Sequence, residues 1–254
     1  MGIRPNKSQY RQVADVLRER IESGQYPRGS AIPTEDELAE EMEVSRPVVS
    51  RAIAVLRAEG LLRAKHLGKG SIVNEIPTIT RDGTGRQRAD VREQGRGAFD
   101  GELRRLGLTP RSDLVRVGQT EAPAEAAEAL GIETGASVLE RHRVMYANDV
   151  PVQVATSYVP WDIAGGTPLT EVDTGPGGLY SRLADLGHRP TEYTEVIDVR
   201  PPTDDEATVL HMEADQRVYV ITRTAKTAEG RTVETCIHVM PAHQWRLTYT
   251  WSAD

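Results

Sequence analysis

The feature that most constrains the fold of this 254-residue chain is a set of helix-boundary signals between residues 34 and 60. Thr34 is followed three residues later by Glu37, which is the capping-box pattern at the start of a helix. Ser45 and Pro47 give a second start signal, because Ser is a favoured N-cap and Pro fits the first helical turn. Gly60 is typical of the left-handed residue just after a helix. The pattern predicts two short helices joined by a tight turn.

Residues on either side of this pair extend the pattern. Apolar residues at helical spacing predict a first helix over 8–23. Beyond the pair, strand-like stretches at 61–65 and 71–74 flank Gly68-Lys69-Gly70. A short glycine-rich turn between two strands predicts a β-hairpin. Three short helices followed by a hairpin make the winged helix-turn-helix plan. We therefore expect residues 1–76 to form a winged helix-turn-helix domain.

The sequence changes character after residue 76. Residues 77–97 hold few large apolar side chains and several glycines, which predicts a linker. From 98 to 254, β-branched or alternating runs are separated by turn residues and short helical stretches. The fold class we expect there is α+β with a mostly antiparallel sheet. The expected strands are 113–121, 137–146, 152–159, 193–199, 217–227 and 232–239, and the expected helices are 99–106, 124–130, 178–186 and 204–210.

Charge is divided unevenly between these parts. The net charge is −7 for the whole chain, but +1 for residues 1–76 and −10 for residues 99–254. A chain this acidic is no general polyanion binder, so any nucleic acid must be bound by a local basic surface. No apolar run reaches the ~18 residues of a membrane span, and no signal sequence is recognisable. With Cys236 as the single cysteine, we expect a protein of the reducing cytoplasm.

The helix expected at 45–59 carries an apolar face and an opposite polar face. Arginine near the N-terminal end of such a helix can read guanine, and serine there can reach phosphate. Basic residues of the hairpin can reach the backbone or an adjacent groove. From the helix alone, exposed arginines can equally be solvated charges. The predicted DNA-binding residues are Thr34, Ser45, Arg46, Pro47, Ser50, Arg51, Lys65, His66, Gly68 and Lys69.

The N-terminal residues resemble the DNA-binding domain of GntR-type transcriptional regulators over nearly all of 8–74. The residues that carry this resemblance are Ile21, Gly24, Pro27, Gly29, Leu38-Ala39, Val44-Ser45-Arg46, Ala52, Leu56, Glu59-Gly60-Leu61 and Gly68-Lys69-Gly70. The second part resembles the UTRA effector-binding domain of the HutC subfamily, which has a chorismate-lyase-like fold. The residues that carry the second resemblance are Gly107, Pro110, the 139–143 strand, Pro151, the 156–160 segment, Leu179-Tyr180 and Val233-Glu234.

The resemblance implies a homodimeric repressor that binds an inverted-repeat DNA operator and is released by a small-molecule effector. Arg141 and Arg143 match a family pair that binds an anionic group of the effector. Residues two apart on a strand share a face, and arginine suits phosphate or carboxylate. The alternative is that both pair with the domain's own carboxylates. Further effector-binding candidates are Asp100, Gln153, Ser157, Tyr158, Tyr193 and Glu234.

Several positions depart from the family pattern. The family commonly has Arg where this chain has Asp36, and often has Arg where it has Ser50, so the operator is expected to differ. Members that bind sugar phosphates often have a carboxylate where this chain has Ala155 and a hydroxyl where it has Asp100. We therefore do not expect an amino-sugar phosphate as effector.

Catalytic and metal chemistry find little support in the sequence. The six histidines fall in no metal-binding spacing, and Cys236 fits a buried structural thiol. We expect no cofactor and no enzyme activity. Two alternatives to the effector-controlled repressor remain: a ligand-independent regulator of plasmid transfer or maintenance, and a chorismate-lyase-like enzyme fused to a DNA-binding module.

Overall fold

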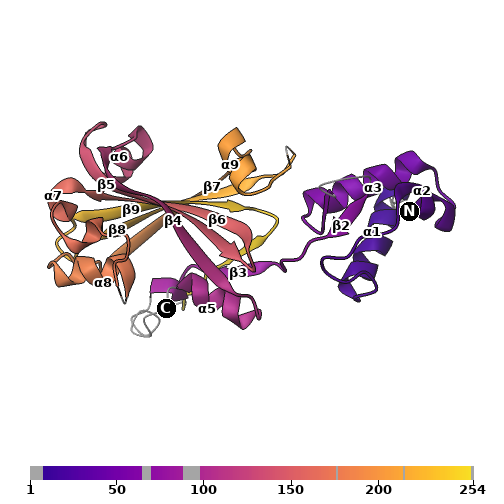
Figure 1. Cartoon of the computed structure of the whole chain (residues 1–254), viewed down its shortest axis with the longest axis horizontal. Helices are drawn as coiled ribbons and strands as arrows, with labels where there is room; N and C mark the ends of the chain where they lie inside the picture. Colours follow the sequence, from indigo (N-terminus) through magenta and orange to yellow (C-terminus); the bar gives the residue numbers. More distant parts are fainter. Residues whose placement is uncertain (1–7, 65–69, 88–97, 176, 214, 253–254) are drawn as a thin grey trace. The chain divides into compact units, whose positions relative to one another are not determined.

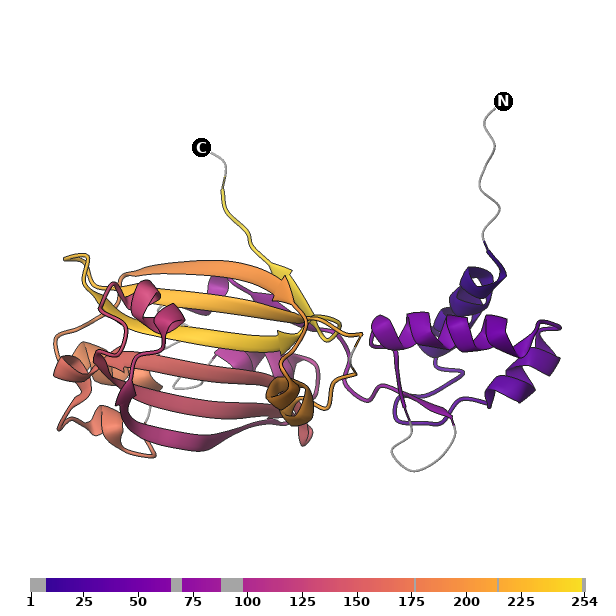
Figure 2. The same cartoon turned by 90° about the horizontal axis from the view of Figure 1, so that it is seen from above.

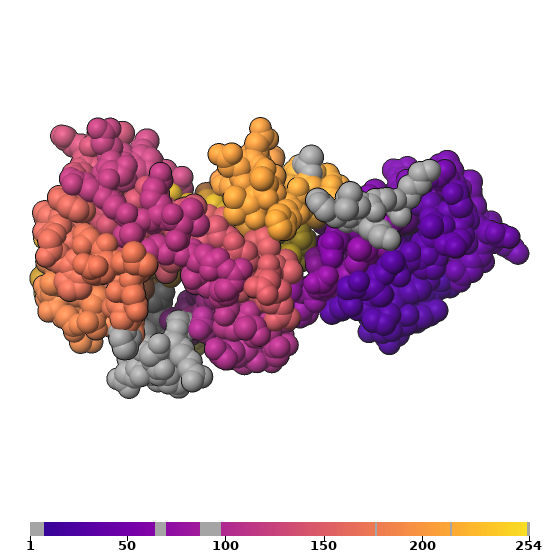
Figure 3. All heavy atoms as spheres, viewed as in Figure 1, coloured from indigo at the N-terminus to yellow at the C-terminus, as the bar shows by residue number. Residues whose placement is uncertain are grey.

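The computed structural model describes residues 8–64, 70–87, 98–175, 177–213 and 215–252. The chain divides into two compact units, Met1–Pro77 and Thr78–Asp254, which the colours of Figure 3 distinguish along the sequence. No helix in the described ranges is long and apolar enough to cross a membrane.

The first unit is a small helical domain with a two-stranded wing (Figure 1). Its apolar core joins all three helices to the wing, and Leu17, Leu38 and Leu56 are completely buried in it. Thr34 and Glu37 form the expected capping box at the start of the second helix. Ser45 occupies the expected N-cap position, although its side chain makes no capping hydrogen bond. The elements are α1 (Gln9–Glu22), α2 (Glu35–Glu41), α3 (Arg46–Ala58), β1 (Leu62–Ala64) and β2 (Ser71–Val73).

The wing is held against the third helix by one arginine. β1 and β2 pair antiparallel, with Arg63 opposite Ile72. Arg57 of α3 donates hydrogen bonds to the Ser71 hydroxyl at 2.9 Å and to the Gly70 carbonyl at 3.4 Å. The orientation of β2 relative to α3 is therefore fixed by side-chain bonds as well as by the core.

The second unit is built on a six-stranded antiparallel sheet with the order β4-β5-β6-β9-β8-β7 (Figure 2). This confirms the expected α+β class with a mostly antiparallel sheet. The sheet strands are β4 (Pro110–Glu121), β5 (Ser137–Ala147), β6 (Val150–Pro160), β7 (Glu192–Arg200), β8 (Val218–Lys226) and β9 (Thr232–Pro241). The helices and 3-10 turns are η1 (Gly85–Gln87), α5 (Ala98–Arg105), α6 (Ala124–Leu130), α7 (Trp161–Ala164), η2 (Pro168–Thr170), α8 (Gly178–Asp185) and α9 (Asp204–Val209).

Helices cover both faces of this sheet. In Figure 1, α6 and α9 lie above the sheet and α5 and α8 lie below it. The upper face packs Tyr158 and Val138 against the alanines of α6. The lower face, which we call the inner face, packs Leu139 and Val159 against Leu183 of α8. Each strand thus presents alternate residues to two different environments.

The prediction of a linker over 77–97 is wrong for residues 79–82. Residues Ile79–Asp82 form β3, which pairs in parallel with β10 (Trp245–Thr248) at the other end of the chain. Ile79 and Arg81 are completely buried, so this segment belongs to the second unit. The segment lacks the apolar run of a strand because it forms half of a two-stranded sheet whose partner is distant in sequence. Residues 88–97 of the expected linker lie outside the described residues.

Two buried ion pairs fasten this segment to the rest of the unit. Arg81 donates to both carboxylate oxygens of Glu195 on β7, at 2.8 Å for the Nη1 bond. Arg86 donates to both carboxylate oxygens of Glu102 on α5, at 2.8 and 2.6 Å. Each pair joins elements far apart in sequence, and neither arginine has appreciable access to solvent.

We predict that Glu195→Gln lowers the free energy of unfolding by about 3 kcal/mol, because it leaves the Arg81 charge buried and unpaired. Chemical denaturation of the full chain measures this. Glu192→Gln, at an exposed position on the same strand, is the control and should change stability by less than about 0.5 kcal/mol. Equal effects of the two substitutions would contradict the structural role of the pair.

The same pair predicts a pH dependence. Burial raises the pKa of Glu195, but hydrogen bonds from Arg81 and Tyr249 outweigh it, and the pKa lies below its usual value. The stabilisation is therefore present above the unfolded-state pKa of about 4.3 and is lost as the pH falls through the lower folded value. Glu195→Gln should weaken this acid-induced loss.

Candidate functional site

The third helix presents the two faces that its sequence predicts. Val49, Ala52, Ile53 and Leu56 are buried in the core of the first unit. The residues proposed to read or contact DNA all lie on the exposed side, as the helix period requires. These exposed residues are Ser45, Arg46, Pro47, Ser50 and Arg51. Thr34 is exposed at the start of α2, where its hydroxyl is engaged in the capping box.

Arg46 is held by the acidic first turn of α2. Its Nε lies 3.2 Å from a Glu35 oxygen and 3.3 Å from an Asp36 oxygen. The Arg46 side chain remains 58% exposed, and that of Asp36 remains 73% exposed. The guanidinium therefore stays accessible while two carboxylates restrain it. Asp36 thus places a restraining negative charge beside Arg46.

Arg51 is stacked on an aromatic ring from the first helix. Its guanidinium carbon lies 4.2 Å from the ring centroid of Tyr10, which is a cation–π distance. The Tyr10 hydroxyl accepts a hydrogen bond from Nε of Arg11, and this bond lowers the pKa of Tyr10. No local spacing of residues predicts this contact, because Tyr10 and Arg51 come from different helices.

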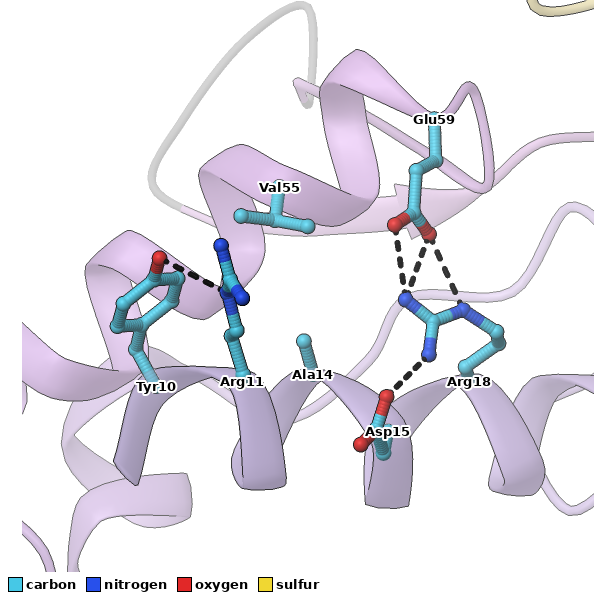
Figure 4. A pocket seen from close by; sticks show the side chains of 7 residues that line it. All are labelled: Tyr10, Arg11, Ala14, Asp15, Arg18, Val55 and Glu59. Atoms are coloured by element: carbon cyan, nitrogen blue, oxygen red, sulfur yellow. Dashed lines mark hydrogen bonds and ion pairs between the residues drawn. The ribbon is translucent and has the colours of Figure 1, made fainter. Parts of the chain in front are cut away.

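A hollow of about 310 Å³ lies between α1 and α3 (Figure 4). Arg18 bridges one end of it, donating to Glu59, the C-cap residue of α3, at 2.8 Å and to Asp15 of its own helix at 2.7 Å. Tyr10 and Arg11 lie at its other end. These charges neutralise one another across the two helices, so the arrangement braces α1 against α3.

Four of the predicted DNA-binding residues, Lys65, His66, Gly68 and Lys69, lie outside the described residues.

In the second unit, strand pairing brings most of the predicted effector-binding residues to the inner face. Arg141 and Arg143 on β5 lie opposite Ser157 and Ala155 on β6. Gln153 is two residues from Ala155 and shares that face. Tyr193 and Glu234, on β7 and β9, also contact the inner-face helix α8 through Tyr180.

Arg141 is already bonded to the protein backbone. Its Nη1 donates to the carbonyls of Leu169 and Glu171 at 2.8 and 2.5 Å, and its Nη2 donates to that of Val172 at 3.0 Å. Burial lowers the pKa of Arg141, and the neighbouring charge of Arg143 acts in the same direction. This guanidinium therefore fixes the loop between η2 and α8 to the sheet.

Two predicted candidates lie apart from this group. Tyr158 follows Ser157 directly, so it points to the opposite face and packs against α6. Asp100 is half-buried on α5 and forms no ion pair with Arg141 or Arg143. His142 likewise points away from the two arginines and contacts the Thr156 hydroxyl at 2.8 Å, as alternation predicts.

Three further inner-face residues were missed from the sequence: Tyr180, Arg223 and His238. Tyr180 donates its hydroxyl hydrogen bond to Glu234 at 2.7 Å. Arg223 lies 3.7 Å from the other Glu234 oxygen, and His238 contacts the Gln153 amide nitrogen at 3.2 Å. Strand alternation from Cys236 and Glu234 could have assigned His238 to this face, but nothing in the sequence paired β8 with β9 in this register.

The inner face thus combines several guanidinium groups with hydroxyl and amide donors, which is chemistry suited to anions. Cys236 is completely buried there, and burial raises the pKa of its thiol, consistent with the expected structural role. Within the described ranges, no group of three or more His, Cys, Asp and Glu side chains is placed to hold a metal ion.

Two family models match the chain in the order of its two units. Residues 9–73 match the gntR family of bacterial regulatory proteins, and residues 105–246 match the UTRA domain. Together the matches cover both the winged helix-turn-helix and the six-stranded sheet.

Individual relatives agree with these models. The chain is 31% identical to an HTH-type transcriptional regulator of Streptomyces coelicolor, over 98% of this chain and 93% of the relative. It is 26% identical to the HTH-type transcriptional repressor NagR of Bacillus subtilis, over 89% of this chain and 87% of the relative. A crystallised protein assigned to the GntR family of transcriptional regulators superposes with a TM-score of 0.61 at 28% identity, over 98% and 99% of the two chains. The chain belongs to the GntR family, carries a UTRA domain, and is a DNA-binding transcriptional regulator and not an enzyme.

Proposed function

We propose that the chain acts as a homodimeric repressor in the bacterial cytoplasm, where it binds an inverted-repeat operator and is released by a small anionic effector. The exposed N-terminal half of α3, with Arg46 and Arg51 on one accessible side, is the observation that carries the DNA-binding part. The inner-face arginines support the effector part.

In this proposal Arg46 and Arg51 read bases in the major groove. Arginine forms bidentate bonds to guanine, each worth roughly 1–3 kcal/mol of discrimination. Thr34, Ser45, Pro47 and Ser50 position the helix against the phosphates, with the help of Lys65, His66, Gly68 and Lys69 on the hairpin. The acidic second unit discourages nonspecific adhesion to DNA elsewhere.

For the effector, we propose that Arg143, Ser157, Gln153 and Glu234 contact the ligand on the inner face, with Asp100 and Tyr193 at its margin. Arg141 then acts through the loop that it binds, since its donors are occupied by carbonyls. Release of DNA requires the effector to bind the DNA-incompetent arrangement more tightly than the competent one. A ligand bound beside Arg141 would shift the loop that Arg141 holds. Such a shift can make the affinity of the effector differ between the two arrangements of the protein.

We predict specific binding of the chain to an inverted repeat, measured by gel shift and footprinting on its own upstream promoter DNA at moderate salt. Arg46→Ala should weaken this binding by about 1–3 kcal/mol and relax specificity at one base pair of each half-site. Arg231→Ala, on the surface of the second unit, is the matched control and should bind like the parent. Unchanged affinity and specificity for Arg46→Ala would show that α3 is not the reading element.

We predict that Asp36→Asn raises operator affinity roughly two- to tenfold, because it removes a charge that repels phosphate and holds Arg46. The measurement is a salt-titrated gel shift. Glu40→Gln on the same helix removes an equal charge away from Arg46 and should have a smaller effect. A loss of affinity in Asp36→Asn would instead mean that the ion pair orients Arg46 for its contact.

We predict that Tyr10→Leu lowers operator affinity roughly two- to fivefold, since Arg51 loses the ring that orients it. Tyr10→Phe keeps the ring and removes only the hydroxyl, so it should bind like the parent. Thermal unfolding of both variants controls for damage to α1. If Tyr10→Phe and Tyr10→Leu weaken operator binding equally, the Tyr10 hydroxyl and not the ring supports the contact of Arg51 with DNA.

A further inference from the structure

Two rows of paired residues cross the inner face from β5 to β8. In one row Arg141, Ser157, Cys236 and Arg223 lie side by side, and in the next Arg143, Ala155, His238 and Ile221 do so. Ala155, Ser157 and Cys236 are all small, and we call them the small-residue floor. Between Arg143 and Arg223, β6 and β9 thus contribute three small side chains and one large one, His238.

The first end of this floor is marked by Arg143. Its contact to a described side chain is a long hydrogen bond of 3.4 Å to the Ser157 hydroxyl. Its Nε is buried without a partner, and no carboxylate among the described residues forms an ion pair with it. Arg143 thus offers a charged, planar set of donors that the protein itself leaves nearly unused.

The other end is marked by Arg223. This residue is only 8% exposed, yet its Nε has no partner, and the nearest paired carboxylate, that of Glu234, is 3.7 Å away. That oxygen belongs to a carboxylate which already accepts a hydrogen bond from Tyr180. No described residue accepts a normal hydrogen bond from the Arg223 guanidinium. The Arg223 charge is compensated by this long ion pair and by the Tyr180 ring, 5.3 Å from the guanidinium carbon, so an acceptor at normal hydrogen-bond distance would stabilise it further.

His238 supplies a neutral donor beside Arg223. It is 4% exposed, and burial together with the nearby arginines holds its pKa well below the usual value. The Gln153 amide nitrogen lies 3.2 Å from Nδ1 and donates to it, so the ring hydrogen is on Nε2. Nε2 is buried with no partner. An N–H donor is therefore available on the same side of the floor as Arg223.

The other buried arginines of this face show the contrast. Arg81 and Arg86 each bind a carboxylate of the protein through two oxygens, those of Glu195 and Glu102. The fold therefore pairs its buried guanidinium groups wherever they hold elements together. Arg141 is satisfied by three backbone carbonyls, whereas Arg143 has no ion pair with a described carboxylate and Arg223 has only the long one to Glu234.

We propose that this inner face binds a short dicarboxylate, with one carboxylate on Arg143 and Ser157 and the other on Arg223 and His238. The inference rests on the proposed effector-controlled function and names the chemical class of the effector. Arg143 and Arg223 stand three strands apart, which places their backbones roughly 14 Å from each other. Their long side chains narrow that distance, but one compact anion can engage only one of them well, whereas a dicarboxylate satisfies both.

The test measures thermal unfolding and calorimetric binding of the full chain with malonate, succinate, glutarate and adipate at constant ionic strength. Acetate, butyrate and inorganic phosphate are the comparison ligands. We expect saturable binding of at least one dicarboxylate, with a raised unfolding temperature, and no comparable response to the monocarboxylates or to phosphate. Binding that is equally tight for phosphate, or absent for all four dicarboxylates, overturns the proposal.

Two substitutions test the two ends separately. Arg143→Met and Arg223→Met should each weaken dicarboxylate binding roughly 10- to 100-fold, because each removes a charge-assisted anchor. Arg143→Met should keep an unfolding temperature at least as high as the parent, since it removes a half-buried charge without a carboxylate partner. His238→Leu, which removes the Nε2 donor and keeps the Arg223–Glu234 ion pair, is a second variant for the Arg223 end should Arg223→Met lower stability, and it should also weaken dicarboxylate binding. Arg231→Gln is the control and should bind like the parent.

Operator gel shifts on the same samples separate this proposal from the function on which it rests. A chain that binds its operator but ignores every dicarboxylate overturns the ligand class and leaves DNA binding intact. A dicarboxylate that binds but does not alter operator affinity confirms the site and contradicts effector-controlled release. A variant whose ligand binding is unchanged after loss of Arg143 or Arg223 rejects the corresponding contact.

Discussion

Burial of guanidinium groups on one face of a six-stranded sheet is the constraint on which the second unit depends. A buried charge needs hydrogen-bonded partners. Each arginine there either joins two elements of the fold or keeps guanidinium donors available for a ligand. Arg81 and Arg86 join β3 and η1 to β7 and α5 through Glu195 and Glu102. Arg141 fastens the loop after η2 through three carbonyls. Arg143 and Arg223 have neither a carboxylate nor a carbonyl at normal hydrogen-bond distance among the described residues.

The alternation of strand residues places neighbouring residues of this sheet in two different environments. Ser157 faces the arginines, whereas the next residue, Tyr158, packs against α6 on the other side. His142 likewise stands between Arg141 and Arg143 in sequence but faces the opposite layer. A one-residue shift in register would exchange these roles entirely. The pairing of β5 with β6 thus determines which polar residues share a face with Arg141 and Arg143.

In the first unit, contacts within the protein restrain the two arginines that we propose to read DNA. Arg46 is held by Glu35 and Asp36, and Arg51 is stacked on Tyr10. Restraint reduces the conformational entropy lost on binding, while the carboxylates also compete with phosphate for the same guanidinium. The two effects oppose each other at Arg46. At Arg51 the Tyr10 ring restrains the side chain and no carboxylate of this pair competes. This chain therefore combines a preorganised contact and a competing one on a single helix face.

The sequence by itself determined the local elements: the capping box at Thr34, the helix start at Ser45, the polar side of α3, and the six strands of the sheet. These features depend on residues within a few positions of one another, so their signals are readable directly. Only the tertiary structure decided that residues 79–82 form a strand with 245–248, that Tyr10 supports Arg51, and that Arg223 and His238 face Arg143. These contacts join residues far apart in the chain, and their geometry follows from strand register and burial, which no local pattern encodes.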